Sequence, residues 1–220
     1  VTKGSQSQTS RVLTNAMGET IESRDNMGNV VYTSYYPDGN VKETYTSVHS
    51  SEKITFTYDD HGNRATIDDP NAGLIETLYD GFGNLVLQVD AKGDSTTFTY
   101  DISGRLTESA DSRGTTQYSY CQDTSKVYFG KIVSIENNST FINETFSYDE
   151  SYGRLVSHSR EADSKEFTYN YQYDWYGRPF SKTYPSGFGI SYSYNNYGFL
   201  KSVLADGKKV WSCNSINEYG

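Results

Sequence analysis

The three histidines of the chain are the first candidates for acid–base or metal chemistry, and their spacing supports neither role. They are His49, His61 and His158, and none stands within metal-ligand spacing of another. The chain holds no His-Glu-x-x-His motif, which would place two ligands on one helix face. His61 takes a variable position of a predicted turn. We therefore interpret it as an exposed turn residue, and the sequence predicts no metal site.

Carboxylates are the second candidates, because two of them facing each other across a cleft can act as acid and base. The pairs Asp59-Asp60 and Asp68-Asp69 are sequence neighbours, and neighbours on a strand point to opposite faces. A calcium loop needs aspartates at alternate positions before a glycine, and the pattern fails at Gly62. Aspartate at the start of a turn is the preferred interpretation.

Motifs for nucleophilic or nucleotide chemistry are missing from the sequence as well. It contains no Gly-x-Ser-x-Gly elbow, no phosphate-binding loop and no dinucleotide fingerprint. We therefore predict that the chain is not an enzyme, with no catalytic residue and no cofactor.

Aromatic side chains are the third candidates, since their rings can stack on sugars or bases, and the chain has 21 tyrosines. The periodic tyrosines, such as Tyr58 and Tyr100, stand at a strand end just before a turn, where a cross-strand aromatic ladder needs them for structure. Other aromatics fall outside that period, on predicted turns, and four of them are the candidate ligand-binding residues: Phe82, Trp175, Tyr176 and Phe188. Structural and ligand-binding roles both remain open for these four.

The elements that position these residues follow from one recurring phrase: an aromatic, Asp or Asn, two variable residues, and Gly. Gly62, Gly83 and Gly104 succeed one another every 21 residues, and Gly177 and Gly198 have the same spacing. A fixed period indicates a repeat architecture. The phrase occurs at 58–62, 79–83, 100–104, 173–177 and 194–198.

Weaker turn signals lie midway between these phrases, so that a turn is expected every ten or eleven residues. Asp or Asn favours the first position of a type I turn, and glycine in the left-handed conformation closes a short hairpin loop with a bulge. The segments between turns alternate, as where Phe98 and Tyr100 face away from Thr97 and Thr99. We predict an all-β fold of tandem β-hairpin repeats, with a period of about 21 residues, forming one long curved or spiralling antiparallel sheet.

The domain organisation predicted from this pattern is a single array over residues 1–220. Longer loops are expected near 48–52 and 121–145, where the period loosens. Another copy of the phrase begins at 217–220, so we expect the chain to be a fragment of a longer protein.

Charge and cysteine content limit the partners. A net charge of −9 argues against nucleic-acid binding, and no apolar run approaches the roughly 20 residues that span a bilayer. Cys121 and Cys213 belong to no Cys-x-x-Cys motif. A disulfide between them and two free thiols are both possible, and the second is the simpler interpretation.

The stretch from Tyr100 through Gly104-Arg105-Leu106 to Gly114-Thr115-Thr116 and Tyr118-Ser119-Tyr120 resembles one unit of the YD repeat, also called the Rhs repeat. Residues 148–155 match it again, and the resemblance extends over roughly 15–220. The family includes bacterial Rhs polymorphic toxins, Tc toxin shell subunits, wall-associated proteins and teneurins. The resemblance implies a β-sheet that spirals into a hollow shell, which in bacterial members encloses a toxic C-terminal domain. The autoproteolytic segment of the family finds no match, so neither processing nor toxin activity is carried over.

Two functional hypotheses follow. The first is a non-catalytic structural section of an Rhs/YD-repeat shell, from a large secreted or cell-surface bacterial protein that encapsulates or presents a toxin or effector domain. Its partners would be neighbouring repeats and a C-terminal effector domain. The second is a carbohydrate- or protein-binding adhesion module that uses the exposed turn aromatics. Neither involves nucleic acid or membrane insertion, and unpaired sheet edges predict edge-to-edge oligomers of the fragment.

Overall fold

The computed structural model of the chain describes residues 10–140 and 142–213, and in these ranges every regular element is a β-strand. The incomplete phrase expected at 217–220 lies outside the described residues. The chain divides into two compact units, Val1–Arg105 and Leu106–Gly220. Each unit is described separately below.

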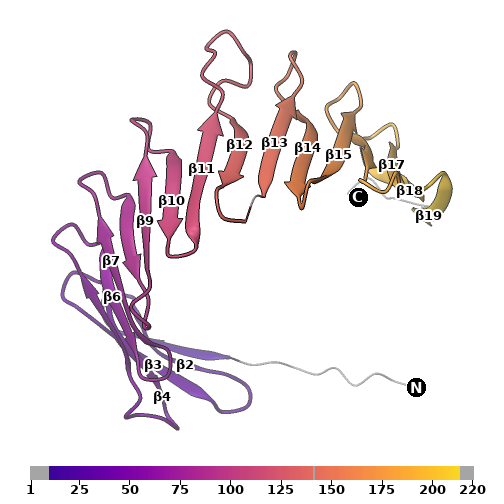
Figure 1. Cartoon of the computed structure of the whole chain (residues 1–220). Helices are drawn as coiled ribbons and strands as arrows, with labels where there is room; N and C mark the ends of the chain where they lie inside the picture. Colours follow the sequence, from indigo (N-terminus) through magenta and orange to yellow (C-terminus); the bar gives the residue numbers. More distant parts are fainter. Residues whose placement is uncertain (1–9, 141, 214–220) are drawn as a thin grey trace, which may run out of the picture. The chain divides into compact units, whose positions relative to one another are not determined.

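The first unit is an antiparallel meander in which each strand pairs with the next along the chain (Figure 1). Its strands are β1 (Arg11–Thr14), β2 (Thr20–Arg24), β3 (Val30–Tyr35), β4 (Val41–Thr46), β5 (Ile54–Tyr58), β6 (Arg64–Asp69), β7 (Gly73–Tyr79), β8 (Leu85–Val89) and β9 (Ser95–Tyr100).

The second unit repeats this arrangement, again with every strand antiparallel to its sequence neighbour (Figure 1). Its strands are β10 (Leu106–Asp111), β11 (Gly114–Tyr120), β12 (Ile132–Asn137), β13 (Asn143–Tyr148), β14 (Leu155–Ala162), β15 (Lys165–Tyr173), β16 (Pro179–Thr183), β17 (Gly189–Tyr194), β18 (Leu200–Ala205) and β19 (Lys208–Ser212). The predicted all-β fold of tandem hairpins is confirmed.

The recurring phrase forms the turns in the predicted way. In the turn after β5, the Gly62 amide donates to the Asp59 carbonyl at 3.0 Å, and the Asp59 amide donates to the Asn63 carbonyl at 2.8 Å. Gly62 has φ of 83°, a left-handed angle that side chains disfavour. The pairing register shifts between Thr57 and Tyr58, where the extra residue of a β-bulge is accommodated.

Neither unit encloses a closed hydrophobic core. Among the described residues only Val30, Gly153 and Ser202 are buried, and the two that carry side chains are 4% and 7% exposed. Side chains therefore pack mainly across strands on the sheet faces, as where Phe56 lies opposite Ile67. The opposite face carries hydroxyl pairs, such as Thr57 and Thr66, whose oxygens lie 2.7 Å apart. The predicted division into an aromatic–aliphatic face and a Thr/Ser face is confirmed for this pair of strands.

The longest irregular segment joins β11 to β12, inside the range where a longer loop was expected. Two hydrogen bonds hold its ends together. The Cys121 amide donates to the Lys131 carbonyl at 2.8 Å, and the Gly130 amide donates to the Cys121 carbonyl at 2.9 Å. No disulfide forms between Cys121 and Cys213 in the part of the chain that the structure describes.

Candidate functional site

The aspartates of the repeat phrase are used to build the turns. One Asp174 carboxylate oxygen accepts the backbone amides of Tyr176 and Arg178, both at 2.9 Å, and the other accepts Arg178 Nε at 2.7 Å. Partial burial would raise the pKa of Asp174, but the side-chain and backbone hydrogen bonds from Arg178 outweigh it and hold the pKa below its usual value. The predicted turn-capping role is confirmed here.

Asp149 performs the same task in a turn that is one residue longer. Its carboxylate accepts the amides of Ser151 at 3.1 Å and Tyr152 at 2.6 Å, and also the Arg154 amide at 2.9 Å and Nε at 3.0 Å. Burial acts to raise the pKa of Asp149, yet these hydrogen bonds from Arg154 and Tyr152 lower it to about 2. The Asp149 carboxylate therefore serves to hold the turn in its conformation.

The tyrosines of the phrase are structural as well. Five of their hydroxyls donate a hydrogen bond to a backbone carbonyl near the start of an earlier strand, 15 to 18 residues back in the chain. Such bonds join Tyr58 to Val41 at 2.9 Å, Tyr100 to Leu85 at 2.8 Å, Tyr148 to Ile132 at 2.8 Å, Tyr173 to Leu155 at 2.9 Å and Tyr194 to Pro179 at 2.8 Å. These tyrosines therefore have a structural role, because they join strands of the sheet.

The four candidate turn aromatics are exposed, but the structure does not gather them into one site. Trp175 and Tyr176 are 90% and 80% exposed and lie on the β15–β16 turn. Phe188, 40% exposed, follows the next turn at the opposite end of β16, where it packs against Tyr184 at 5.8 Å between ring centroids. Phe82, 94% exposed, belongs to the other unit. A ligand-binding role for these residues stays a prediction.

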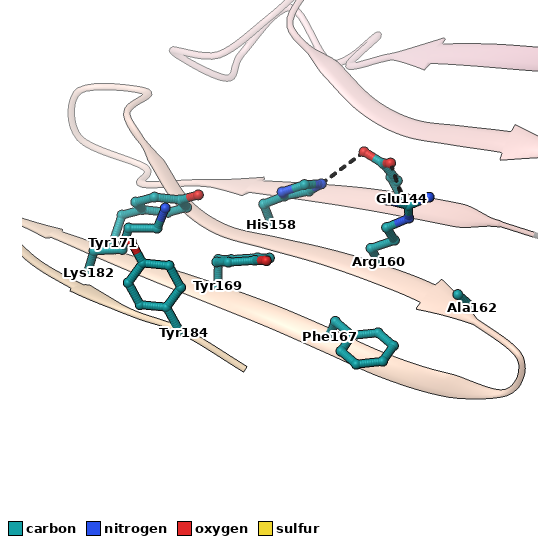
Figure 2. A pocket seen from close by; sticks show the side chains of 9 residues that line it. All are labelled: Glu144, His158, Arg160, Ala162, Phe167, Tyr169, Tyr171, Lys182 and Tyr184. Atoms are coloured by element: carbon teal, nitrogen blue, oxygen red, sulfur yellow. Dashed lines mark hydrogen bonds and ion pairs between the residues drawn. The ribbon is translucent and has the colours of Figure 1, made fainter. Parts of the chain in front are cut away.

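A depression that the sequence did not predict lies on the face of the second unit, over β13–β16 (Figure 2). Its volume is about 560 Å³. We call it the β13–β16 groove, and its lining consists of Glu144, His158, Arg160, Ala162, Phe167, Tyr169, Tyr171, Lys182 and Tyr184.

An ion-paired end and an aromatic floor make up this groove. His158 Nε2 lies 2.9 Å from one Glu144 oxygen, and Arg160 Nε lies 3.8 Å from the other. The His158 ring stacks between two neighbours, at 4.7 Å from Phe146 and 6.0 Å from Tyr169 between centroids. Tyr169 in turn meets Tyr184 edge-on at 5.7 Å.

Lys182 completes the groove with a cation placed over the rings. Its Nζ lies 5.1 Å from the centroid of Tyr169, 5.6 Å from that of Tyr171 and 4.5 Å from that of Tyr184. These distances fall within the range of cation–π attraction. The groove thus combines aromatic rings with a carboxylate and cations, a composition suited to binding a polar ligand.

Part of this groove carried a sequence signal. Alternation along 167–173 predicts that Phe167, Tyr169 and Tyr171 share one face. Their partners follow only from the strand register, which sets His158 opposite Tyr169 and Lys182 opposite Tyr171. In the described residues no group of three or more His, Cys, Asp or Glu side chains could hold a metal ion. Over the same ranges no helix is long and apolar enough to cross a membrane.

Comparison with known proteins agrees with the repeat pattern. The RHS Repeat family model matches residues 79–120, which confirms the predicted repeat in that segment. The Tc holotoxin pore of Photorhabdus luminescens with a mutated TccC3 is similar in structure, with a TM-score of 0.72, 18% identity, and coverage of 88% of this chain and 11% of that one. The crystal structure of TcdB2-TccC3 gives a TM-score of 0.71, 17% identity, and coverage of 88% and 12%.

These similarities show a shared fold, and this chain spans about a tenth of the length of the chains that it matches. The comparison with curated proteins finds no match.

Proposed function

We propose that this chain, which carries the YD/Rhs repeat, is a structural section of a shell wall in a larger secreted or cell-surface bacterial protein. The observation that carries the proposal is the use of the repeated residues: the aspartates cap turns, and the tyrosines bond back to earlier strands. In a chain built this way, the recurring polar groups hold turns and strands together. Stacked repeats of this kind form extended walls rather than deep pockets.

The partners of such a wall are the neighbouring repeats and an effector domain of the same protein. The similarity in fold to the Tc holotoxin pore supports this part, because that structure is a toxin assembly. On this proposal the section has no catalysis of its own. The isolated 220-residue chain should associate through its sheet edges, since unpaired edge strands invite pairing, and sedimentation at increasing concentration measures that.

Limited proteolysis of the longer protein tests the shell role. The effector segment should resist protease in the native protein and become sensitive when Gly177→Val disrupts a turn of the wall. Trp175→Ala on the same turn serves as the matched control and should leave the effector protected. If protease cleaves the effector as readily in the native protein as in the Gly177→Val variant, encapsulation is contradicted.

A second candidate function is adhesion through the turn aromatics. In the second unit, alternate turns of the meander share one edge of the sheet, at intervals of about 10 Å. Four strongly exposed aromatics lie on these turns: Tyr152, Trp175, Tyr176 and Tyr197, at 65%, 90%, 80% and 87% exposure. This row supports binding to an extended glycan or protein.

A glycan array with the native chain and the Trp175→Ala and Tyr176→Ala variants tests this second function. Ile102→Ala, which changes an exposed aliphatic residue on a turn, is the control. Binding that the two aromatic substitutions reduce and the control leaves intact would support adhesion. Binding indifferent to all three substitutions would remove the turn aromatics from consideration.

A further inference from the structure

The turns of the second unit differ in character between the two edges of its sheet (Figure 1). The turns at one edge join β13 to β14, β15 to β16 and β17 to β18, and exposed aromatic side chains stand at their tips: Tyr152, Trp175, Tyr176 and Tyr197. The turns at the other edge are tipped by polar residues such as Arg113, Ser139, Asp163 and Ser186. We call the four aromatics the aromatic turn row. Exposed aromatics gathered in this way are typical of an interaction surface.

The turns beneath the row hold it in a fixed conformation. The backbone amides of Tyr152, Tyr176 and Tyr197 each donate to the capping side chain of their own turn, at 2.6 Å, 2.9 Å and 3.0 Å. The guanidinium of Arg154 lies 4.4 Å from the Tyr152 centroid, and that of Arg178 lies 4.9 Å from the Tyr176 centroid. A surface that is fixed before it binds loses less conformational entropy when the partner arrives.

The spacing of the row selects the shape of the partner. Neighbouring strands lie about 4.8 Å apart, so successive turns at this edge, which are two strands apart, stand about 9.5 Å apart. A polyproline II helix advances about 9.3 Å in each three-residue turn and brings every third side chain to the same face. Alternate residues of a β-strand recur at about 7 Å and fit this spacing less well. A polyproline II segment of about nine residues therefore reaches all the turns of the row.

The hydrogen-bonding groups of the row are complementary to such a helix. Tyrosine hydroxyls and the indole N–H of tryptophan can donate hydrogen bonds. The carbonyl groups of a polyproline II helix have no partner within the helix, and proline has no N–H that would compete for them. Proline-rich segments also dock on aromatic surfaces through their apolar rings. The row thus offers the donors and the ring surfaces that a proline-rich segment requires.

The charges beside the row favour an uncharged partner. The Arg154 guanidinium is paired with Asp149 at 3.0 Å, and the Arg178 guanidinium is paired with Asp174 at 2.6 Å. An anionic polymer or an acidic lipid surface would have to compete with these aspartates for the two cations. An uncharged segment leaves both ion pairs intact, so its binding should depend little on salt.

We propose that the aromatic turn row binds an uncharged proline-rich segment of a partner protein, in the polyproline II conformation. Prolines three residues apart pack against Tyr152, against Trp175 and Tyr176, and against Tyr197. The hydroxyl and indole N–H groups donate to the carbonyls between these prolines. The 220 residues hold four prolines, no two of them adjacent, and so do not supply such a segment themselves. The inference rests on the adhesion function proposed above and names the class of its partner.

Tryptophan fluorescence gives a direct readout, because Trp175 lies in the row. Trp211 is the other tryptophan of the chain, so the titrations use a Trp211→Phe background. The probes are proline peptides of three, six and nine residues, with a Gly-Ser nonapeptide as control. Affinity should rise by about tenfold or more from the proline tripeptide to the nonapeptide, because the longer helix reaches more turns. Equal affinity for the two proline peptides, or equally tight binding of the Gly-Ser peptide, would overturn the proposal.

Substitutions locate the binding on the row. The Tyr152→Ala, Tyr197→Ala double variant should lower affinity for the proline nonapeptide about tenfold, to that of the tripeptide, since only the central turn keeps its aromatics. Phe82→Ala is the matched control, because Phe82 is an equally exposed turn aromatic in the other unit and should leave the affinity unchanged. Far-UV circular dichroism checks that the variants fold. A double variant that folds and binds the nonapeptide as tightly as the native chain would place the site elsewhere.

Three further measurements separate the proline-rich partner from its alternatives. If phosphatidylcholine vesicles shift Trp175 emission to the blue and the proline peptides do not, the row contacts lipid and the inference is wrong. If sedimentation shows self-association that Trp175→Ala abolishes, and the peptides fail to bind, the row joins copies of this chain instead. If a glycan or another protein binds through the row while the proline peptides do not, the adhesion function stands and only its proline-rich partner is removed.

Discussion

The guanidinium of Arg178 lies over the ring of Tyr194, with its central carbon 4.2 Å from the ring centroid. Arg178 ends one turn of the repeat phrase and Tyr194 precedes the next, so the contact joins consecutive repeats. The same guanidinium lies 4.9 Å from the centroid of Tyr176 in its own turn. Arg154 repeats the pattern one step earlier, 4.9 Å from the centroid of Tyr173. Successive turns of the second unit are thus linked along one edge of the sheet.

Replacing Arg178 should therefore weaken the second unit. Arg178→Gln removes both ring contacts and the ion pair with Asp174, and we expect a loss of about 1 kcal/mol in the free energy of unfolding. Urea denaturation measures it. Arg24→Gln is the control, since Arg24 forms a more exposed ion pair with Glu22 and should change stability by less than about 0.5 kcal/mol. Equal effects would mean that stacking between turns contributes nothing.

The hydroxyl of Tyr173 should contribute measurable stability. Tyr173→Phe removes the 2.9 Å hydrogen bond to the Leu155 carbonyl while keeping the ring, at an expected cost of about 1 kcal/mol. Tyr152→Phe offers the comparison, because Tyr152 is 65% exposed and retains its ring beside Arg154 after the change. Thermal melts that place both variants at the native midpoint would show that the repeated hydroxyl is dispensable.

The left-handed glycines predict an asymmetric response to substitution within one turn. Gly104 has φ of 74°, and Gly104→Val places a β-branched side chain at this angle, which should cost more than about 1 kcal/mol. Ile102 is fully exposed on the same turn, so Ile102→Val should be nearly neutral. Chemical denaturation of the two variants compares them, and similar losses would contradict the turn conformation.

Acid should destabilise the second unit through Asp149. Its folded-state pKa, about 2, lies below the ordinary value of 3.8. The folded state therefore binds this proton more weakly than the unfolded state does. The resulting stabilisation is complete above about pH 4 and is lost as the pH falls through about 2.

Denaturation midpoints measured from pH 5 to pH 2 check this dependence. Asp149→Asn should lower stability at pH 5 and flatten the decline toward pH 2, because the titrating group is gone. Asp163→Asn, which makes the same change on the β14–β15 turn, is the control variant. A native slope that survives in Asp149→Asn would assign the acid sensitivity to other carboxylates.

Local chemistry explains why so much of this fold can be predicted from sequence. The turn at Asp59 and Gly62 is formed by residues within five positions of one another, through an aspartate that accepts neighbouring amides and a glycine that accepts a positive φ. Turn positions then define where strands begin and end, and alternation assigns each side chain to a face. The 21-residue period and the antiparallel pairing of neighbouring strands follow from that short-range chemistry.

The groove required information that no local pattern contains. The β14–β15 hairpin turns at Asp163 and Ser164, whose φ values are 50° and 58°, without the glycine that would mark such a turn. That turn sets the register in which His158 lies opposite Tyr169, and the next turn brings Lys182 opposite Tyr171. Because a slip of one residue would send every one of these side chains to the other face, only the paired strands decide that a histidine, a lysine and a row of tyrosines meet.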